Sequence, residues 1–235
     1  MYKRQVTTDA AAPTQLTSGA GIEWSPTILS NGDITHFRSE GRRPAHAAIL
    51  AAGQARELAP QSTPRDFPES QLVEPQSVIF PAADGLKIHG QLFVPHGVAE
   101  GPLKDGKRVP AVLFFHGGSR RQMLLGWHYR DYYHNAYAMN QYLASRGYVV
   151  LSVNYRSGTG YGLEFREAEN YGAHGASEFN DVLGAGLYLQ SLAYVDPQRI
   201  GLWGGSYGGY LTAMGLARAS HLFAAGVDLH GVHDW

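Results

Sequence analysis

The sequence predicts an α/β protein whose main domain is built on a mostly parallel sheet and is preceded by a short all-β segment. Three observations support this. From about residue 76, strand-length apolar runs alternate with segments of helical periodicity. Before residue 60, β-like pieces and turns follow one another without a helical pattern. Between them, residues 59–70 hold three prolines among small polar residues, which is typical of a linker.

Composition excludes several classes of protein. Of 235 residues, 44% are hydrophobic and 17% charged, which indicates a globular protein with a core. The net charge is −1 and no basic block occurs, so we expect no nucleic-acid partner. The absence of cysteine excludes disulfides and thiolate metal sites. The apolar runs have strand length, so we expect no membrane partner either, while oligomeric state stays open.

The first five residues, MYKRQ, resemble a translated sequencing adapter. We therefore expect residues 1–5 to be an artefact and the chain to be a fragment whose natural N-terminus is missing. The region that follows lacks the apolar core of a secretory signal. The sequence does not decide whether the protein is located in the cytoplasm, in the periplasm or outside the cell.

Residues 6–60 have the scale of one β-propeller blade. The pieces IEWSP, ITHFRS and AHAAIL predict three or four short strands within about 45 residues. Asn31-Gly32 is a strong hairpin signal, because both residue types tolerate positive φ. We predict a terminal propeller-blade remnant over 6–60 and a linker over 61–70, with an irregular N-terminal extension as the alternative.

Residues 71–235 form the predicted second domain. An antiparallel hairpin is expected around Asp84-Gly85, then a strand over 110–115, a helix over 135–145 that stops at Gly147, and a strand over 148–155. A second helix begins near Ser177. A strand over 199–203, a helix to Arg218 and a strand over 224–229 follow. The second helix is expected to bury one face, formed by Phe179, Val182, Leu183 and Leu187.

The stretch GLWGGSYGGY contains the pattern G-x-S-x-G between a predicted strand and a predicted helix. In this context Ser206 occupies a nucleophile elbow, the strained turn of the α/β-hydrolase fold. Gly204 and Gly208 must be small, because strand and helix approach closely there. The helix N-terminus favours developing negative charge. The pattern predicts Ser206 as a catalytic nucleophile, with a structural glycine turn as the alternative.

A nucleophilic serine needs an oxyanion hole, and two segments can supply it. The amide of Tyr207 follows the nucleophile directly. HGGS, after the strand over 110–115, offers the amides of Gly117 and Gly118, of which we favour Gly118. His116 is expected to orient this loop and not to carry a proton.

The base and its acid follow the serine in this fold, in the order Asp or Glu and then His. The remaining segment holds no later strand that could present a histidine beside Ser206, although it contains candidates. These are Asp228, Asp234, His221, His230 and His233. We therefore expect a C-terminally truncated α/β-hydrolase domain whose triad Asp and His are missing, and an inactive fragment.

The sequence offers two other candidate sites, one for a dinucleotide and one for a metal ion, and both are less well supported than the serine site. SGTGYG follows a strand, but Leu163 stands where a dinucleotide fingerprint requires its third glycine, so no cofactor is expected. His230 and His233 with Asp234 lack a fourth ligand, so no metal is expected.

These motifs resemble the prolyl oligopeptidase family of serine peptidases, which couple a β-propeller to an α/β-hydrolase domain. The matching pieces are GLWGGSYGGY, HGGS, NYRSGTGYG, SEFNDV and VDPQRIGLWG. The resemblance implies a peptide substrate, Ser206 as nucleophile and Tyr207 as oxyanion donor. It also implies that Val232 and Trp235, in the final GVHDW, line the substrate pocket.

One position departs from part of the family. His116 stands where several members have a tyrosine that donates to the oxyanion, so the resemblance points to the branch with acylaminoacyl peptidases, which relies on backbone amides. Peptide specificity stays open. The alternatives are a carboxylesterase, since elbow and oxyanion loop are shared, and a catalytically dead binding protein of the same fold.

Overall fold

The computed structural model describes residues 4–5, 14–98 and 106–234. The chain divides into two compact units. Unit 1 comprises Met1–Glu74 and Leu124–Ala138, and unit 2 comprises Pro75–Met123 and Met139–Trp235. Residues 124–138 thus belong to the N-terminal unit, although they interrupt unit 2 in the sequence.

Unit 1 contains a four-stranded antiparallel sheet with the order β3-β4-β5-β6. The strands are β3 (Ile22–Ile28), β4 (Ile34–Ser39), β5 (His46–Ala51) and β6 (Gln54–Glu57). The predicted hairpin at Asn31-Gly32 is confirmed, but its loop spans residues 29–33 and only Gly32 of the pair has positive φ, +87°. A separate two-stranded pair joins β1 (Arg4–Gln5) to β2 (Thr14–Gln15).

Residues 59–75, which include the predicted linker, contain two single 3-10 turns, η1 (Pro60–Ser62) and η2 (Glu69–Gln71). The rest of this stretch lies outside helices and strands. Four prolines account for this, because proline donates no backbone hydrogen bond and restricts the residue before it.

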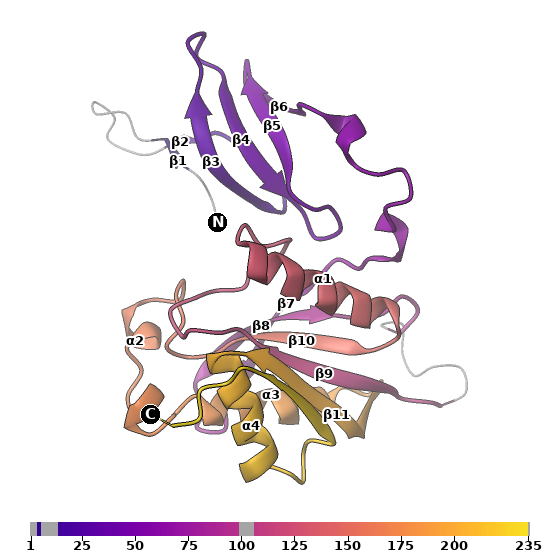
Figure 1. Ribbon diagram of the computed structural model, residues 1–235, viewed down its shortest axis with the longest axis vertical. Coiled ribbons are helices and arrows are strands. Elements are labelled where there is room, and N and C mark those ends of the chain that lie inside the picture. The colour runs from indigo at the N-terminus through magenta and orange to yellow at the C-terminus, as the bar shows by residue number, and fades with distance from the viewer. Residues whose placement is uncertain (1–3, 6–13, 99–105, 235) are drawn as a thin grey trace. The chain divides into compact units, whose positions relative to one another are not determined.

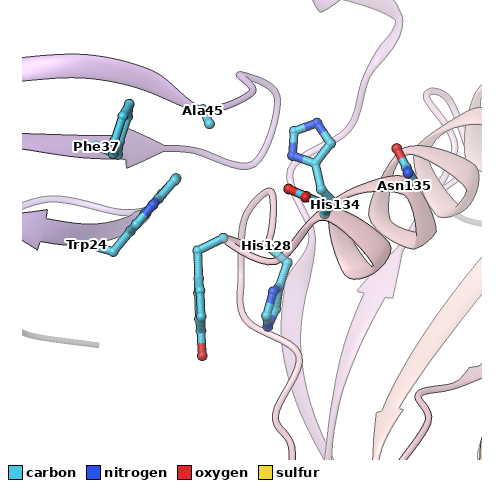
Figure 2. Close-up of a pocket in the computed structure, with 8 residues that line it drawn as sticks. Trp24, Phe37, Ala45, His128, His134 and Asn135 are labelled. Atoms are coloured by element: carbon cyan, nitrogen blue, oxygen red, sulfur yellow. The ribbon is translucent and has the colours of Figure 1, made fainter.

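The inserted segment of unit 1 is held to the sheet by hydrogen bonds. The hydroxyl of Ser39 donates to the carbonyl of Trp127 at 2.6 Å, and the hydroxyl of Tyr137 donates to the carbonyl of Gly41 at 2.6 Å. Beside these contacts lies a hollow of about 480 Å³. Figure 2 shows Trp24 and Phe37 on one side of it and His134 on the other.

Unit 2 is built on a six-stranded sheet with the order β12-β11-β9-β10-β8-β7 (Figure 1). β7 and β8 form the predicted antiparallel hairpin, and β8 pairs antiparallel with β10. The pairs β10–β9, β9–β11 and β11–β12 are parallel, so the predicted mostly parallel sheet is confirmed. The strands are β7 (Gln76–Pro81), β8 (Lys87–Phe93), β9 (Val109–Phe115), β10 (Val149–Asn154), β11 (Val195–Gly205) and β12 (Ala225–Leu229).

Both faces of the sheet are covered. On one face α3 (Phe179–Ser191) and α4 (Tyr207–Arg218) contact each other and β11 (Figure 1). Trp203 points to the other face, since side chains alternate along a strand. There its indole nitrogen donates to the side-chain oxygen of Asn140 in α1 (Asp131–Ser145) at 3.3 Å. The shorter elements are α2 (Leu163–Arg166) and the 3-10 turn η3 (Gly172–His174).

Two details of the sequence prediction are wrong. Leu187 was expected on the buried face of α3, but its side chain is 51% exposed. Val182 is buried as predicted, and the helix buries Ala185 and Leu189 in place of Leu187, next to glycines that allow close packing. Strand β11 begins at Val195 and not after Pro197, because Val195 already pairs with Val109 and an irregularity follows before Ile200.

No helix in the described part of the chain is long and apolar enough to span a membrane.

We predict that the 235-residue chain self-associates through β12. This strand forms one edge of the six-stranded sheet, and Val227 is 56% exposed on it. An open edge with apolar side chains pairs readily with another chain. Size-exclusion chromatography with light scattering should show oligomers, and Val227→Lys should raise the monomer fraction. Leu163→Lys, at an exposed residue outside the strands, should not, and equal effects of both would contradict pairing through β12.

Candidate active site

The candidate site lies where four parallel strands end at the same edge of the sheet. β9 is followed by His116, β10 by Tyr155, β11 by Ser206 and β12 by His230. In open α/β sheets the carboxyl ends of the strands are the usual place for a binding site. The sheet therefore brings together the HGGS loop and the serine, which are 90 residues apart in the chain.

Ser206 occupies a strained turn between β11 and α4. Its backbone has φ +57° and ψ −120°, in a region that non-glycine residues rarely adopt. Its amide donates to the carbonyl of Leu229 at 2.9 Å, and its carbonyl accepts from the amide of Tyr210 at 3.0 Å. Ser206 is exposed although the residues on both sides are buried. The turn thus lifts one hydroxyl out of the core.

Gly204 and Gly208 are small for the predicted steric reason. A Cβ at Gly204 would lie 2.5 Å from the carbonyl oxygen of Gly208 and 2.6 Å from that of Phe115. A Cβ at Gly208 would overlap the carbonyl oxygen of Phe115. Helix α4, the end of β9 and the end of β11 therefore pack backbone against backbone.

The HGGS loop follows directly from this close contact. His116 is fully buried, and its ring stacks on Tyr155 with centroids 4.3 Å apart. Its carbonyl accepts a hydrogen bond from the Tyr155 hydroxyl at 2.8 Å, and its Nδ1 lies 3.2 Å from the carbonyl of Gly117. Gly118 has φ +45° and is half-buried. The imidazole thus packs within the protein beneath the loop.

The side chain of Tyr207 points away from the serine into the core. The residue is 5% exposed, and its hydroxyl donates to Glu178 Oε1 at 2.8 Å. Burial raises the pKa of Tyr207 above its ordinary value, and the Glu178 carboxylate raises it further. Tyr207 is therefore a protonated donor wherever the fold persists.

Two buried polar groups near the site escaped the sequence analysis. Glu178 precedes α3 and is fully buried. Arg156 follows β10 and binds two carboxylates, with Nη1 2.6 Å from Asp84 Oδ2 and Nε 2.9 Å from Asp181 Oδ1. Arg156 lowers the pKa of Asp84. A signal was available, since Glu178 and Asp181 lie at helical spacing with the apolar Val182 and Ala185.

Two of the candidate acidic and histidine residues after Ser206 pair with each other. His233 Nε2 lies 2.7 Å from Asp228 Oδ2, and the amide of Gly231 donates to Asp228 Oδ1 at 2.9 Å. His230 has φ +45° and is exposed. Within residues 4–5, 14–98 and 106–234, no three His, Asp or Glu side chains are arranged to hold a metal ion.

Of the two residues predicted to line the substrate pocket, the structure describes only Val232. Val232 is 46% exposed in the segment after β12. Trp235 lies outside the described residues. The structure thus places an exposed apolar side chain in the segment that follows the elbow's neighbouring strand.

Strand, strained serine turn and helix on a mostly parallel sheet define an α/β-hydrolase-type domain. The model of the prolyl oligopeptidase family matches residues 134–235, the part of the chain that carries the elbow. The match does not include the HGGS loop or unit 1 up to Tyr133.

Relatives and solved structures agree with this family. Dipeptidyl aminopeptidase BIII of Pseudoxanthomonas mexicana is 39% identical over 130 residues, which is 54% of this chain and 17% of the relative. Human dipeptidyl peptidase 8 is 32% identical over 167 residues, 68% of this chain and 17% of the relative. The acylaminoacyl peptidase of Pyrococcus horikoshii superposes with a TM-score of 0.72 at 26% identity, over 94% of this chain and 33% of that structure.

A puromycin hydrolase superposes with a TM-score of 0.78 at 26% identity, over 95% of this chain and 32% of that structure. The chain therefore spans about a third of these solved structures and less of the curated relatives. Because the superposition covers nearly all of this chain, the predicted fold class is confirmed, a β-sheet segment followed by an α/β-hydrolase-type domain.

We predict that Gly204→Ala destabilises the protein by about 1–3 kcal/mol or more, as overpacking of a rigid core does. The new methyl group would meet two backbone oxygens that cannot rotate away. Gly201→Ala is the matched control on the same strand, because a Cβ there would lie 3.4 Å from the nearest atom, an ordinary contact. Thermal unfolding of both variants measures the difference. Equal melting temperatures would show that the elbow tolerates a side chain at position 204.

Proposed function

We propose that this chain is part of a serine peptidase in which Ser206 attacks the carbonyl carbon of a peptide bond. The hydroxyl oxygen bonds to that carbon, the amine leaves with a proton, and water then hydrolyses the acyl-enzyme. The observation that carries the proposal is the exposed serine at φ +57° between β11 and α4. That geometry is costly, and such strain is found at functional sites.

The oxyanion that forms during this attack would be stabilised by two backbone amides. The amide of Tyr207 is the first of α4, where the helix leaves its amides unpaired and its dipole favours negative charge. The amide of Gly118, with that of Gly117 beside it, comes from the loop after β9. The contact of Gly208 with Phe115 supports this pairing, because it brings that loop against the start of α4.

The general base and the acid that orients it would come from residues that this chain does not include. Asp228 and His233 pair with each other, but Asp228 also closes the turn with Gly231, which supports a structural role. Val232 and Trp235 would line the pocket for the residue before the scissile bond. No metal or cofactor takes part in this mechanism.

The names of the similar proteins support a peptide substrate over a simple ester. They include dipeptidyl peptidases, an acylaminoacyl peptidase and a puromycin hydrolase. The four-stranded sheet of unit 1 also supports this choice, because it has the size of one propeller blade.

We predict that the purified 235-residue chain does not turn over aminoacyl or peptidyl chromogenic substrates. Without base and acid, the loss in kcat is about 10⁶ in a comparable serine protease. In the complete protein we expect full hydrolysis, and Ser206→Ala should abolish it together with labelling by a fluorophosphonate.

Two outcomes would contradict this prediction. Substantial turnover by the 235-residue chain that Ser206→Ala removes would show that a base lies within it, with His230 and His233 as first candidates. Hydrolysis of esters but not of peptides by the complete protein would overturn the peptidase assignment.

In the complete protein, Gly118→Pro should lower kcat by at least about 10²–10³, because it removes one oxyanion donor and because proline cannot adopt the φ of +45° at Gly118 and therefore also shifts the loop. His116→Ala should lower kcat far less, because the buried ring packs on Tyr155 and supports the loop. Steady-state kinetics with a peptidyl substrate measure both, and circular dichroism checks the fold. A loss in His116→Ala as large as in Gly118→Pro, with KM and fold unchanged, would make the imidazole itself the donor.

A further inference from the structure

Glu178 joins three separate segments through one carboxylate. Its Oε1 accepts from the Tyr207 hydroxyl at 2.8 Å and from the Ser157 hydroxyl at 2.8 Å. The backbone amide of Gly172 lies 3.1 Å from Oε2 and 3.3 Å from Oε1. The carboxylate therefore links the start of α4, the turn after β10 and the loop before α3.

Burying a carboxylate completely is costly unless it is well hydrogen-bonded. Glu178 has no exposed surface, and the donors come from elements far apart in the sequence. If one donor moves, the buried acceptor loses a partner at a cost that water cannot offset. The arrangement thus holds all three segments in one geometry.

One of these segments carries an amide of the proposed oxyanion hole. The ring of Tyr207 is fixed at one end by Glu178 and stacks on Tyr155, with centroids 5.8 Å apart. Its backbone amide belongs to the same residue, next to Ser206. Fixing the ring therefore restricts the direction in which that amide points.

A second connection leads from Glu178 to the HGGS loop. Beyond Ser157, the amide of Thr159 donates to the carbonyl of Arg121 at 3.0 Å. Arg120 Nη2 donates to the hydroxyl of Tyr171 at 2.7 Å, and Arg120 also contacts the carbonyl of Ser157 at 3.4 Å. The guanidinium of Arg121 lies against Gly118: its Nε would be 3.1 Å from a Cβ atom added at Gly118. Glu178 therefore binds both ends of the loop over 157–172, at Ser157 and at Gly172. Through its contacts with Arg120 and Arg121, this loop restricts the segment that follows Gly118.

We propose that Glu178 is a positioning residue for the oxyanion hole, which holds the amides of Tyr207 and Gly118 at a fixed separation. This inference rests on the proposed function, because it assigns Glu178 a task in the same reaction. A rigid pair of donors stabilises a developing charge without reorganisation, and a misplacement of about 1 Å can cost about 100-fold in rate.

The test uses the complete protein, since we propose that its base and acid lie outside this segment. The variants are Glu178→Gln, Tyr207→Phe and the double variant. The matched control is Asp181→Asn, which removes another fully buried carboxylate from the same region but binds Arg156 and not Tyr207. Active sites are counted with a fluorophosphonate, so that kcat refers to folded enzyme alone.

We expect Glu178→Gln and Tyr207→Phe each to lower kcat about 10- to 100-fold with KM within about twofold of the wild type. The double variant should lose little more than either single variant, since both remove the same link. Affinity for a peptide aldehyde, whose adduct carries the oxyanion, should fall in parallel with kcat. Asp181→Asn should lower the melting temperature but not kcat per active site.

A purely structural role would give a different result. Losses of kcat in Glu178→Gln no larger than in Asp181→Asn, or aldehyde affinity unchanged, would overturn the proposal. Fully additive losses in the double variant would also contradict it. If Ser206→Ala is inactive and Glu178→Gln keeps its kcat, only this inference fails. If Ser206→Ala keeps its activity, the proposed function fails and this inference with it.

Discussion

The site depends on one close contact, that of the backbone of Gly208 in α4 with the carbonyl oxygen of Phe115 at the end of β9. No side chain fits between the two elements. This contact sets the height at which α4 begins above the sheet, and Ser206 must take its unusual backbone angles to connect β11 to a helix so near. The loop after Phe115 starts at the same place. Backbone packing alone therefore places Ser206 beside the loop after Phe115, and no side-chain contact is needed for it.

Long connections around this contact are ordered mainly by polar groups. Between β10 and α3 the chain runs for more than twenty residues with only α2 and η3 as regular elements. Arg156 and Glu178 lie near its two ends and are both buried. Arg156 forms ion pairs with Asp84 and Asp181, while Glu178 accepts hydrogen bonds from neutral donors. Buried charged groups add little net stability, since desolvation offsets their interactions, but they penalise any arrangement that removes their partners. The connection gains a defined shape, and that shape is what a binding surface needs.

The sequence predicted the parts that follow from periodicity and from steric necessity. G-x-S-x-G after an apolar strand leaves few other structures, and alternating strands and helices imply a parallel sheet. Leu187 was placed wrongly because Phe179, Leu183 and Leu187 also share a helical spacing, and only the neighbouring glycines 184 and 186 decide which face is buried. Glu178 was missed because a glutamate beside a helix start usually serves as an exposed cap. Its burial depends on Tyr207, Ser157 and Gly172, which the chain brings together only in the folded state.

Tyr207 combines two tasks that are usually carried by different residues. Its backbone faces the serine turn, while its side chain is anchored inside the protein. A chemical reaction that uses only the amide would be indifferent to the side chain in principle, since every residue except proline has an amide. Under the role that we propose for Glu178 it is not indifferent, because the hydroxyl of Tyr207 is bonded to that buried carboxylate. Exchange of this loop between proteins of this fold would therefore have to transfer the tyrosine together with its buried carboxylate, as one inherited unit.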